Sequence, residues 1–265
     1  MKKHLQIAVL SLGMAASALV FAGTTTTTAV TTPATAAAPT FTPAQVDAMH
    51  TIIHDYIVAN PQILVEASKT LQAQQQKKME AASMGAIAQN KAKLFDDAQS
   101  PSVGEKTAPV TLVEFFDYQC GHCREMAASV EQLISQDKTV RVVFKELPIF
   151  GGASNYAAKA ALAVAMQPGK YYAFHNALLT SNGPLNKDAI MAIAKKTGVD
   201  VAKMTKDMDA PAIEKQLKDN FELAQALKVM GTPTFVIGNK AETTFRFIPG
   251  ATTLQDLQAQ LNAVK

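Results

Sequence analysis

The stretch FFDYQCGHC, from Phe115 to Cys123, contains both cysteines of this 265-residue chain, directly after an apolar run. That run, VTLVEFF at residues 110–116, is continuous and rich in β-branched and aromatic residues, which is typical of a central buried strand. We expect the strand to end at DYQ and a helix to begin at Cys120 and continue through REMAASVEQLIS. A cysteine in the first turn of a helix lies beside free N–H groups and the positive end of the helix dipole, which stabilise a thiolate. The stretch therefore predicts a reactive cysteine pair between a strand and a helix.

The two sulfurs are expected to have different roles. Cys120 begins the helix and is the expected attacking sulfur. Cys123 follows one helical turn later on the same side, where it can close a disulfide and act as the resolving thiol. A purely structural disulfide is the alternative, but so small a loop removes little chain entropy from the unfolded state. We therefore interpret the pair as a redox-active centre.

The residues between the sulfurs tune this centre. His122 can place an imidazole near the Cys120 thiolate, which favours the reduced form and makes the disulfide a better oxidant. A metal site made of Cys120, His122 and Cys123 is the rival interpretation, but three adjacent ligands do not close a tetrahedral site. The sequence therefore predicts no metal and no bound cofactor, because the cysteines themselves carry the electrons. The remaining histidines of the mature chain are interpreted as surface or packing residues: His50, His54 and His175.

The pattern beyond the cysteine pair indicates the fold class. A second strand is expected in TVRVVFKEL, followed by a mainly helical stretch at about 154–230. The chain then closes with TFVIG, TTFRFI and a final helix in TTLQDLQAQLNAV. Two βα units followed by a β-hairpin and a helix give an α/β, thioredoxin-like order with a helical insertion. We assign this domain to residues 98–265.

Three further residues are predicted to serve the pair. Glu114 falls inside the apolar strand, and a buried carboxylate there can relay the proton that Cys123 must lose or gain. A strand-edge glutamate in water is the alternative. In GTPTFVIG, Pro233 begins a predicted strand, where proline cannot donate a ladder hydrogen bond and often marks a cis bond. In this fold such a proline faces the cysteine pair, so the backbone of Thr232 can bind an extended substrate.

Residues 41–97 form a separate helical region in the sequence pattern. After an apolar repeat that begins at Val46, the stretch ANPQILVEASKTL restarts a helix with Asn60 as its cap and Pro61 at its first position. This second helix is expected to run to about Phe95, with a thin apolar stripe and no partner inside its own segment. Association with another copy of the chain is favoured over packing on the main domain. We expect a homodimer, with a homotrimer as the alternative.

No catalytic or binding residues are expected in the first 40 residues. Residues 1–22 have a basic start, an apolar middle and a small residue at Ala22, which predicts a secretory signal peptide cleaved after that residue. Residues 23–40 are a Thr/Ala/Pro tract, interpreted as a flexible leader. The net charge is +3, of which Lys2 and Lys3 supply two charges, so no basic face for nucleic acid is indicated. An exported, oxidising compartment follows, where a close cysteine pair can persist as a disulfide.

Two regions of the chain, the domain that contains the cysteines and the N-terminal helical region, resemble known families. VEFFDYQCGHC, GTPTFVIG and the helical insertion together resemble the DsbA/DsbC/DsbG class of periplasmic thiol:disulfide interchange proteins. IIHDYIVANPQILVEAS is similar to the N-terminal helical region of DsbA-like proteins related to the suppressor-of-copper-sensitivity protein ScsC. The resemblance covers nearly all of the chain after about Phe41. It implies a thioredoxin fold with Cys120 as nucleophile, Cys123 as resolving thiol, Glu114 as buried acid and Pro233 as cis-proline.

The resemblance also bears on the direction of the chemistry. The Gly-His dipeptide of CGHC is similar to that of eukaryotic protein disulfide isomerases and departs from the Pro-His of typical DsbA oxidases. The threonine before Pro233 is similar to that of DsbC-type isomerases. With the helical segment, these features favour isomerase or mixed oxidase and isomerase activity. The implied partners are exported client proteins with cysteines and membrane redox partners of the DsbB or DsbD type. The competing hypothesis is a non-catalytic copper-handling or surface-interaction protein.

Overall fold

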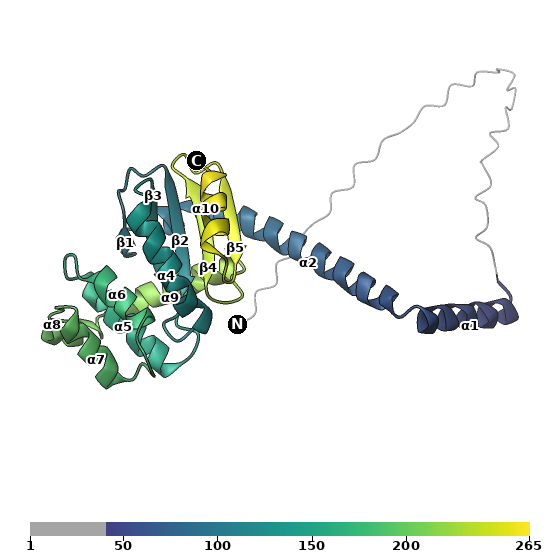
Figure 1. Cartoon of the computed structure of the whole chain (residues 1–265), viewed down its shortest axis with the longest axis horizontal. Helices are drawn as coiled ribbons and strands as arrows, with labels where there is room; N and C mark the ends of the chain where they lie inside the picture. The colour runs from purple at the N-terminus through teal and green to yellow at the C-terminus, as the bar shows by residue number, and fades with distance from the viewer. Residues whose placement is uncertain (1–40) are drawn as a thin grey trace, which may run out of the picture. The chain divides into compact units, whose positions relative to one another are not determined.

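The structure is a computed structural model that describes residues 41–265, shown in Figure 1. The predicted signal peptide and leader lie outside the described residues. The chain divides into two compact units, with the boundary between Asn60 and Pro61. The second unit contains the cysteine pair, and it is the unit in which the site is built.

The first unit contains one described helix, α1 (Pro43–Ala59). It begins with a capping box, in which the Thr42 hydroxyl accepts from the Gln45 backbone and the Gln45 side chain accepts from the Thr42 N–H. It ends at Asn60, whose side-chain amide donates to the Tyr56 carbonyl at 2.8 Å. The predictions that Asn60 caps the following helix and that Pro61 is its first residue were wrong: Asn60 is the C-cap of α1, and Pro61 is the N-cap of the helix that begins at Gln62.

The second helix is shorter than predicted. Helix α2 (Gln62–Gln89) stops at Asn90, and a separate short helix, α3 (Lys91–Phe95), follows. The Asn90 side chain donates to the Ala86 carbonyl at 2.9 Å, which caps the end of α2. The break allows Phe95 to pack on strand β4 (Thr234–Asn239), where a Cβ at Gly238 would lie 2.6 Å from the Phe95 ring. A glycine is therefore required at this close approach.

Five strands form one sheet in the order β1-β3-β2-β4-β5. β2 (Val110–Phe116) and β3 (Val140–Glu146) are parallel, and the other pairs are antiparallel. β5 (Phe245–Pro249) closes one edge beside β4. β1 (Ser102–Val103) is not among the expected strands, because a two-residue strand leaves no pattern in the sequence. The strands expected around VTLVEFF, TVRVVFKEL, TFVIG and TTFRFI are confirmed.

The remaining helices confirm the thioredoxin-like order with a helical insertion. The insertion, expected at about 154–230, consists of five helices between β3 and β4. Helix α4 begins directly after Cys120 and contains Cys123, and α10 closes the chain on the same side of the sheet (Figure 1). The bounds are α4 (Gly121–Gln136), α5 (Gly152–Ala165), α6 (Tyr171–Leu179), α7 (Lys187–Lys196), α8 (Val201–Asp207), α9 (Pro211–Ala226) and α10 (Leu254–Asn262).

Side chains of β2 alternate between the two faces of the sheet. Leu112 and Phe116 pack in the larger core with α4, α10 and the insertion. Val113 and Phe115 pack in a second core with α9, α3 and the end of α2. Burying each such side chain contributes roughly 2 kcal/mol to the free energy of unfolding. Glu114 lies between Leu112 and Phe116 at the same alternate positions of β2, so its carboxyl lies on the face of the sheet that is covered by the cysteine helix α4.

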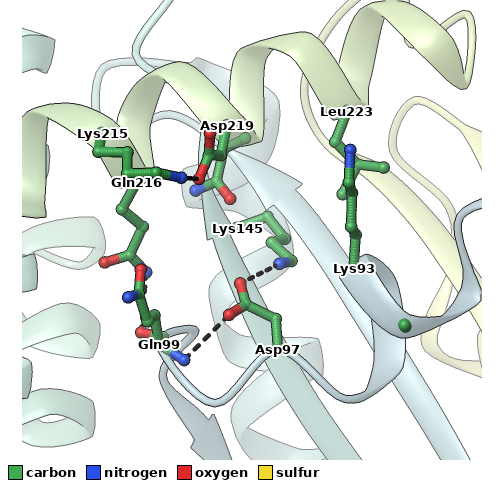
Figure 2. Close-up of a pocket in the computed structure, with 10 residues that line it drawn as sticks. Lys93, Asp97, Gln99, Lys145, Lys215, Gln216, Asp219 and Leu223 are labelled. Atoms are coloured by element: carbon green, nitrogen blue, oxygen red, sulfur yellow. Dashed lines mark hydrogen bonds and ion pairs between the residues drawn. The ribbon is translucent and has the colours of Figure 1, made fainter.

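The opposite face holds a buried ion pair, shown in Figure 2. Lys145 is 1% exposed and donates to Asp97 Oδ2 at 2.8 Å, at the side of a cavity of about 420 Å³. Burial lowers the pKa of Lys145, and Asp97 opposes that shift. The pair joins the segment after α3 to the central sheet. It lies on the face away from the cysteines, because Lys145 follows Phe144, which packs in the larger core.

Candidate active site

Cys120 lies where the sequence places it, as the N-cap residue of α4. Its backbone N–H donates to the Asp117 carbonyl at 3.1 Å, which fixes the turn between β2 and α4. Its thiol donates to the Thr232 carbonyl oxygen at 3.1 Å. The Thr232–Pro233 peptide bond is cis. The fold thus brings together the predicted nucleophile and the predicted substrate-binding pair, which are 112 residues apart in sequence.

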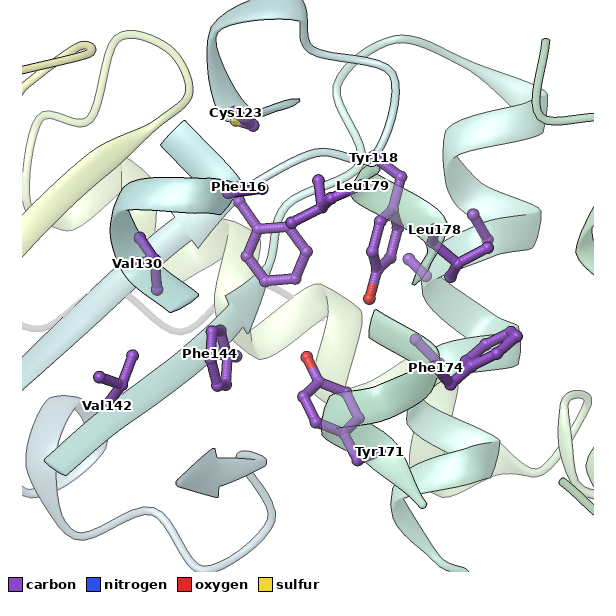
Figure 3. Packing of buried hydrophobic residues seen from close by; sticks show 14 of the residues in the cluster. Phe116, Tyr118, Cys123, Val130, Val142, Phe144, Tyr171, Phe174, Leu178 and Leu179 are labelled. Atoms are coloured by element: carbon purple, nitrogen blue, oxygen red, sulfur yellow. The ribbon is translucent and has the colours of Figure 1, made fainter. Parts of the chain in front are cut away.

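Both cysteines are buried, but Cys120 retains 4% exposure, whereas the Cys123 side chain has none. Cys123 packs in the larger core with Phe116 (Figure 3). Burial raises the pKa of the Cys123 thiol, and the charge of Glu114 adds to that shift, while the Asp117 backbone and the Thr232 hydroxyl oppose it. Both cysteines are free thiols in this structure. Cys123 therefore stays protonated near neutral pH, whereas Cys120 lies at the positive end of a helix.

Glu114 is buried beneath the pair. It is 1% exposed on a strand with neighbours on both sides, so the alternative of a strand-edge residue in water is wrong. Its Oε2 has no hydrogen-bond partner among residues 41–265. Burial raises the pKa of Glu114 to about 8. A carboxyl group with this pKa can donate or accept a proton near neutral pH, and it is close enough to Cys123 for its charge to act on that thiol.

His122 lies on the solvent side of the site. Its ring is 70% exposed, and its Nδ1 lies 2.9 Å from Glu125 Oε2, one turn further along α4. The hydrogen bonds of the described residues thus link the imidazole to Glu125, whereas the sequence predicts an approach to the Cys120 thiolate. The influence of His122 on that thiolate stays a prediction.

Asp117 is a site residue that sequence reasoning missed. Its Oδ1 accepts from the Gln119 N–H at 2.7 Å and from the Ser154 hydroxyl at 2.6 Å. Its Oδ2 accepts from the Phe150 N–H at 3.0 Å. An aspartate that bonds the backbone two residues later is a common turn former, which is the one signal present in the sequence. Asp117 fixes the loop that carries Cys120 to the start of the insertion.

A second buried cluster anchors the same loop. The Tyr118 hydroxyl donates to Glu146 Oε1 at 2.9 Å and lies 3.0 Å from His175 Nδ1. The Tyr171 hydroxyl also donates to Glu146 Oε1, at 3.1 Å, and the two tyrosines face the same buried space in Figure 3. Burial lowers the pKa of His175 to about 3, so its ring is neutral. Of the two interpretations given for His175, packing is confirmed.

Two observations concern metals and membranes. Within residues 41–265, no group of three or more His, Cys, Asp or Glu side chains is arranged to hold a metal ion. In the same part of the chain, no helix combines the length and apolar character needed to cross a bilayer.

Family comparisons agree with this geometry. Residues 111–262 match the DSBA-like thioredoxin domain. Residues 45–78 match the copper resistance protein ScsC N-terminal domain.

Two solved structures are similar to this chain in sequence and fold. The thiol-disulfide exchange protein alpha-DsbA2 from Wolbachia pipientis is 33% identical, covers 69% of this chain and 96% of its own, and superposes with a TM-score of 0.64. Proteus mirabilis ScsC in a transitional conformation is 31% identical, covers 84% of this chain and 96% of its own, with a TM-score of 0.60.

Curated relatives fall into two groups. A probable disulfide bond formation protein D from Bacillus cereus is 29% identical over 57% of this chain and 76% of its own length. The Na(+)/H(+) antiporter NhaA 1 from Salinispora arenicola is 27% identical over 52% of this chain, and the match spans only 21% of the antiporter. The relatives named for disulfide formation and thiol-disulfide exchange bear out the predicted thiol:disulfide oxidoreductase chemistry. The chain has the strand, the cysteine helix and the cis-proline described above, and residues 111–262 match the family. The chain therefore belongs to the DSBA-like thioredoxin domain family.

Proposed function

We propose that the protein forms and isomerises disulfide bonds in exported proteins, with Cys120 as the exchanging sulfur. The observation that carries the proposal is the asymmetry of the pair. Cys120 begins a helix and contacts the Thr232 carbonyl, while Cys123 is buried behind it beside a protonatable Glu114. No bound cofactor is needed, because the two sulfurs exchange the electrons.

In the oxidising direction, a client thiolate attacks the Cys120 sulfur of the Cys120–Cys123 disulfide. A client–Cys120 bond forms, and Cys123 leaves as a thiolate, which takes a proton from Glu114. A second client thiolate then attacks the client sulfur of this mixed disulfide and forms the client disulfide. Cys120 leaves as a thiolate that the end of α4 stabilises, and the enzyme has gained the two electrons that the client has lost.

In the isomerising direction, the Cys120 thiolate attacks a client disulfide. One client sulfur becomes bonded to Cys120 and the other leaves as a thiolate. Another client thiolate then displaces Cys120, so the client disulfide has moved and no net oxidation has occurred. Two features support the isomerising reaction: Thr232 is similar to the threonine before the cis-proline of DsbC-type isomerases, and the Gly121–His122 dipeptide is similar to that of eukaryotic protein disulfide isomerases.

Self-association through the N-terminal helices would place several active sites together. Large apolar side chains are more than half exposed in the first unit (Phe41, Ile52, Ile53, Tyr56 and Val58) and, separately, in the first half of α2 (Leu64, Val65 and Leu71). Exposed apolar side chains in such numbers indicate interaction surfaces. We propose a homodimer, with a homotrimer as the alternative, in the periplasm after removal of residues 1–22. Membrane proteins of the DsbB or DsbD type would set the redox state of the pair.

Refolding of a scrambled multi-disulfide substrate tests the proposal. Cys120→Ser is expected to reduce turnover at least 100-fold, because it removes the attacking sulfur. Gln119→Ser, an exposed neighbour of Cys120, is the control and should retain most of the activity. Stoichiometric copper retention by wild-type protein without turnover would instead support the copper-handling hypothesis and contradict this proposal.

A further inference from the structure

A cavity lies directly beside the substrate-binding segment. Its volume is about 390 Å³, and Thr232, whose carbonyl accepts from the Cys120 thiol, lines it. A client sulfur bonded to Cys120 would therefore lie near Thr232, one of the residues that line this cavity. Such a volume is sufficient for a well-defined binding pocket.

The walls of the cavity come from distant parts of the chain. Met230 precedes the cis-proline segment, while Phe247 and Pro249 belong to β5. Met79 and Ser83 are contributed by α2, which packs on β5 within the same compact unit. Helix α2 therefore has a second role available to it, besides association.

The chemistry of the walls favours an apolar side chain. Met230 is 84% exposed and Met79 is 38% exposed, so two flexible thioether side chains are open to solvent at this site. Methionine side chains adapt to varied apolar partners. The cavity is also lined by Glu80 and Lys228, whose opposite charges give no net preference for a charged ligand.

A buried polar atom in the same wall also points to a ligand. Ser83 is completely buried, and its hydroxyl has no hydrogen-bond partner among the described residues. A buried hydroxyl without a hydrogen-bond partner destabilises the folded protein. A client backbone or side-chain polar group entering the cavity would supply the missing partner.

We infer that this cavity is a client subsite: it receives an apolar side chain one or two residues from the client cysteine that bonds to Cys120, and α2 forms its specificity wall. The inference rests on the proposed function and adds a substrate preference to it. When Cys120 bonds to a client sulfur, it ceases to donate to the Thr232 carbonyl. That oxygen can then accept from the client backbone and hold the chain in an extended form over the cavity.

The test uses oxidised full-length protein and short peptides with one free cysteine. The peptides differ only at the two positions before and the two positions after the cysteine. One of these four positions is varied at a time, and it holds leucine, phenylalanine, alanine or aspartate. The peptide thiolate attacks the Cys120 sulfur, the peptide–Cys120 bond forms, and Cys123 leaves as a thiolate. The adduct is quenched in acid and measured by mass spectrometry, and glutathione serves as the reference thiol.

The rate of each peptide is divided by the rate of glutathione with the same protein. This relative rate is expected to be at least 10-fold higher for the leucine and phenylalanine peptides than for the aspartate peptide. Met79→Glu places a carboxylate at the wall and should remove most of this preference. Ala82→Glu adds the same charge to an exposed position of α2 outside the cavity and should retain it. Because both side chains are exposed, neither variant removes a core contact.

Three outcomes would overturn the inference. Equal rates for all peptides and for glutathione would show that there is no subsite, while the proposed exchange chemistry would stand. In the second outcome, Met79→Glu keeps the preference for apolar peptides, but light scattering shows that the mass of the variant differs from that of wild type. This result would show that a second copy of the chain, and not a client, occupies the cavity. No reaction with glutathione or with any peptide would overturn the proposed function itself.

Discussion

Glu114→Gln should stabilise the reduced protein strongly at alkaline pH and hardly at all in acid. Burial raises the pKa of this carboxyl to about 8 from an ordinary value of 4.5. Between these values the unfolded chain has released the proton and the folded chain retains it. The contribution of Glu114 to stability is therefore fully present below pH 4.5, falls as the pH rises and is lost above pH 8. The loss amounts to about 5 kcal/mol.

Urea unfolding of the reduced protein at pH 4.5 and at pH 9 measures this effect. The variant should gain several kcal/mol relative to wild type at pH 9 and less than about 1 kcal/mol at pH 4.5, because glutamine has no charge to bury. Glu125→Gln, at an exposed position of α4, should change the stability little at either pH. A Glu114→Gln difference that does not depend on pH would show that the carboxyl is ionised in the folded protein.

The same substitution should slow the chemistry. In the proposed oxidising direction, Glu114 gives its proton to the departing Cys123 sulfur, and glutamine cannot do so. Loss of a positioned acid typically reduces a rate by about 100-fold or more.

Replacing exposed apolar side chains of α1 is expected to reduce isomerase activity strongly while the active site remains intact. The triple variant Ile52→Lys, Ile53→Lys and Tyr56→Lys changes side chains that are 67%, 55% and 60% exposed, on a helix with no buried residue. Burial of three such side chains in an assembly is worth roughly 6 kcal/mol per chain. Light scattering should give the mass of a single chain, and refolding of a scrambled substrate should fall at least 10-fold.

The matched control places lysines on the opposite side of α1. Thr51→Lys with Asp55→Lys should leave both the mass and the refolding activity near wild type, since these residues lie on the side of α1 away from Ile52, Ile53 and Tyr56. A triple variant that remains oligomeric, or that is monomeric with full isomerase activity, would contradict the proposed role of the helices. Substitution is preferable to deletion of residues 41–97, because Ile87, Leu94 and Phe95 pack in the core beneath the sheet.

Local patterns in the sequence account for most of the site. A glutamate inside VTLVEFF was expected to be buried, and the alternation of side chains along β2 places it on the face of the cysteine helix. Cys120 was expected at a helix start because an apolar strand ends just before it, and the structure makes it the N-cap of α4. These features depend on residues within about ten positions of each other.

Features that depend on distant contacts were not predictable. Tyr118 bonds to partners 28 and 57 residues away, and nothing in the local pattern of β3 or α6 indicates that Glu146 and His175 meet it. The break at Asn90 was missed because strong helix formers flank this single weak helix former on both sides. The packing of Phe95 against Gly238, far along the chain, favours the break. The short strand β1 likewise depends on its pairing with β3.

The central claim is that Cys120 is the sulfur that bonds to clients and that Cys123 releases them. Reduced Cys123→Ser protein, incubated with a client peptide that contains one disulfide, should accumulate a covalent complex. Peptide mapping by mass spectrometry should place the client cysteine on Cys120, and Cys120→Ser protein should form at least 100-fold less complex. A client attached to Cys123, or equal amounts of complex in the two variants, would contradict the account.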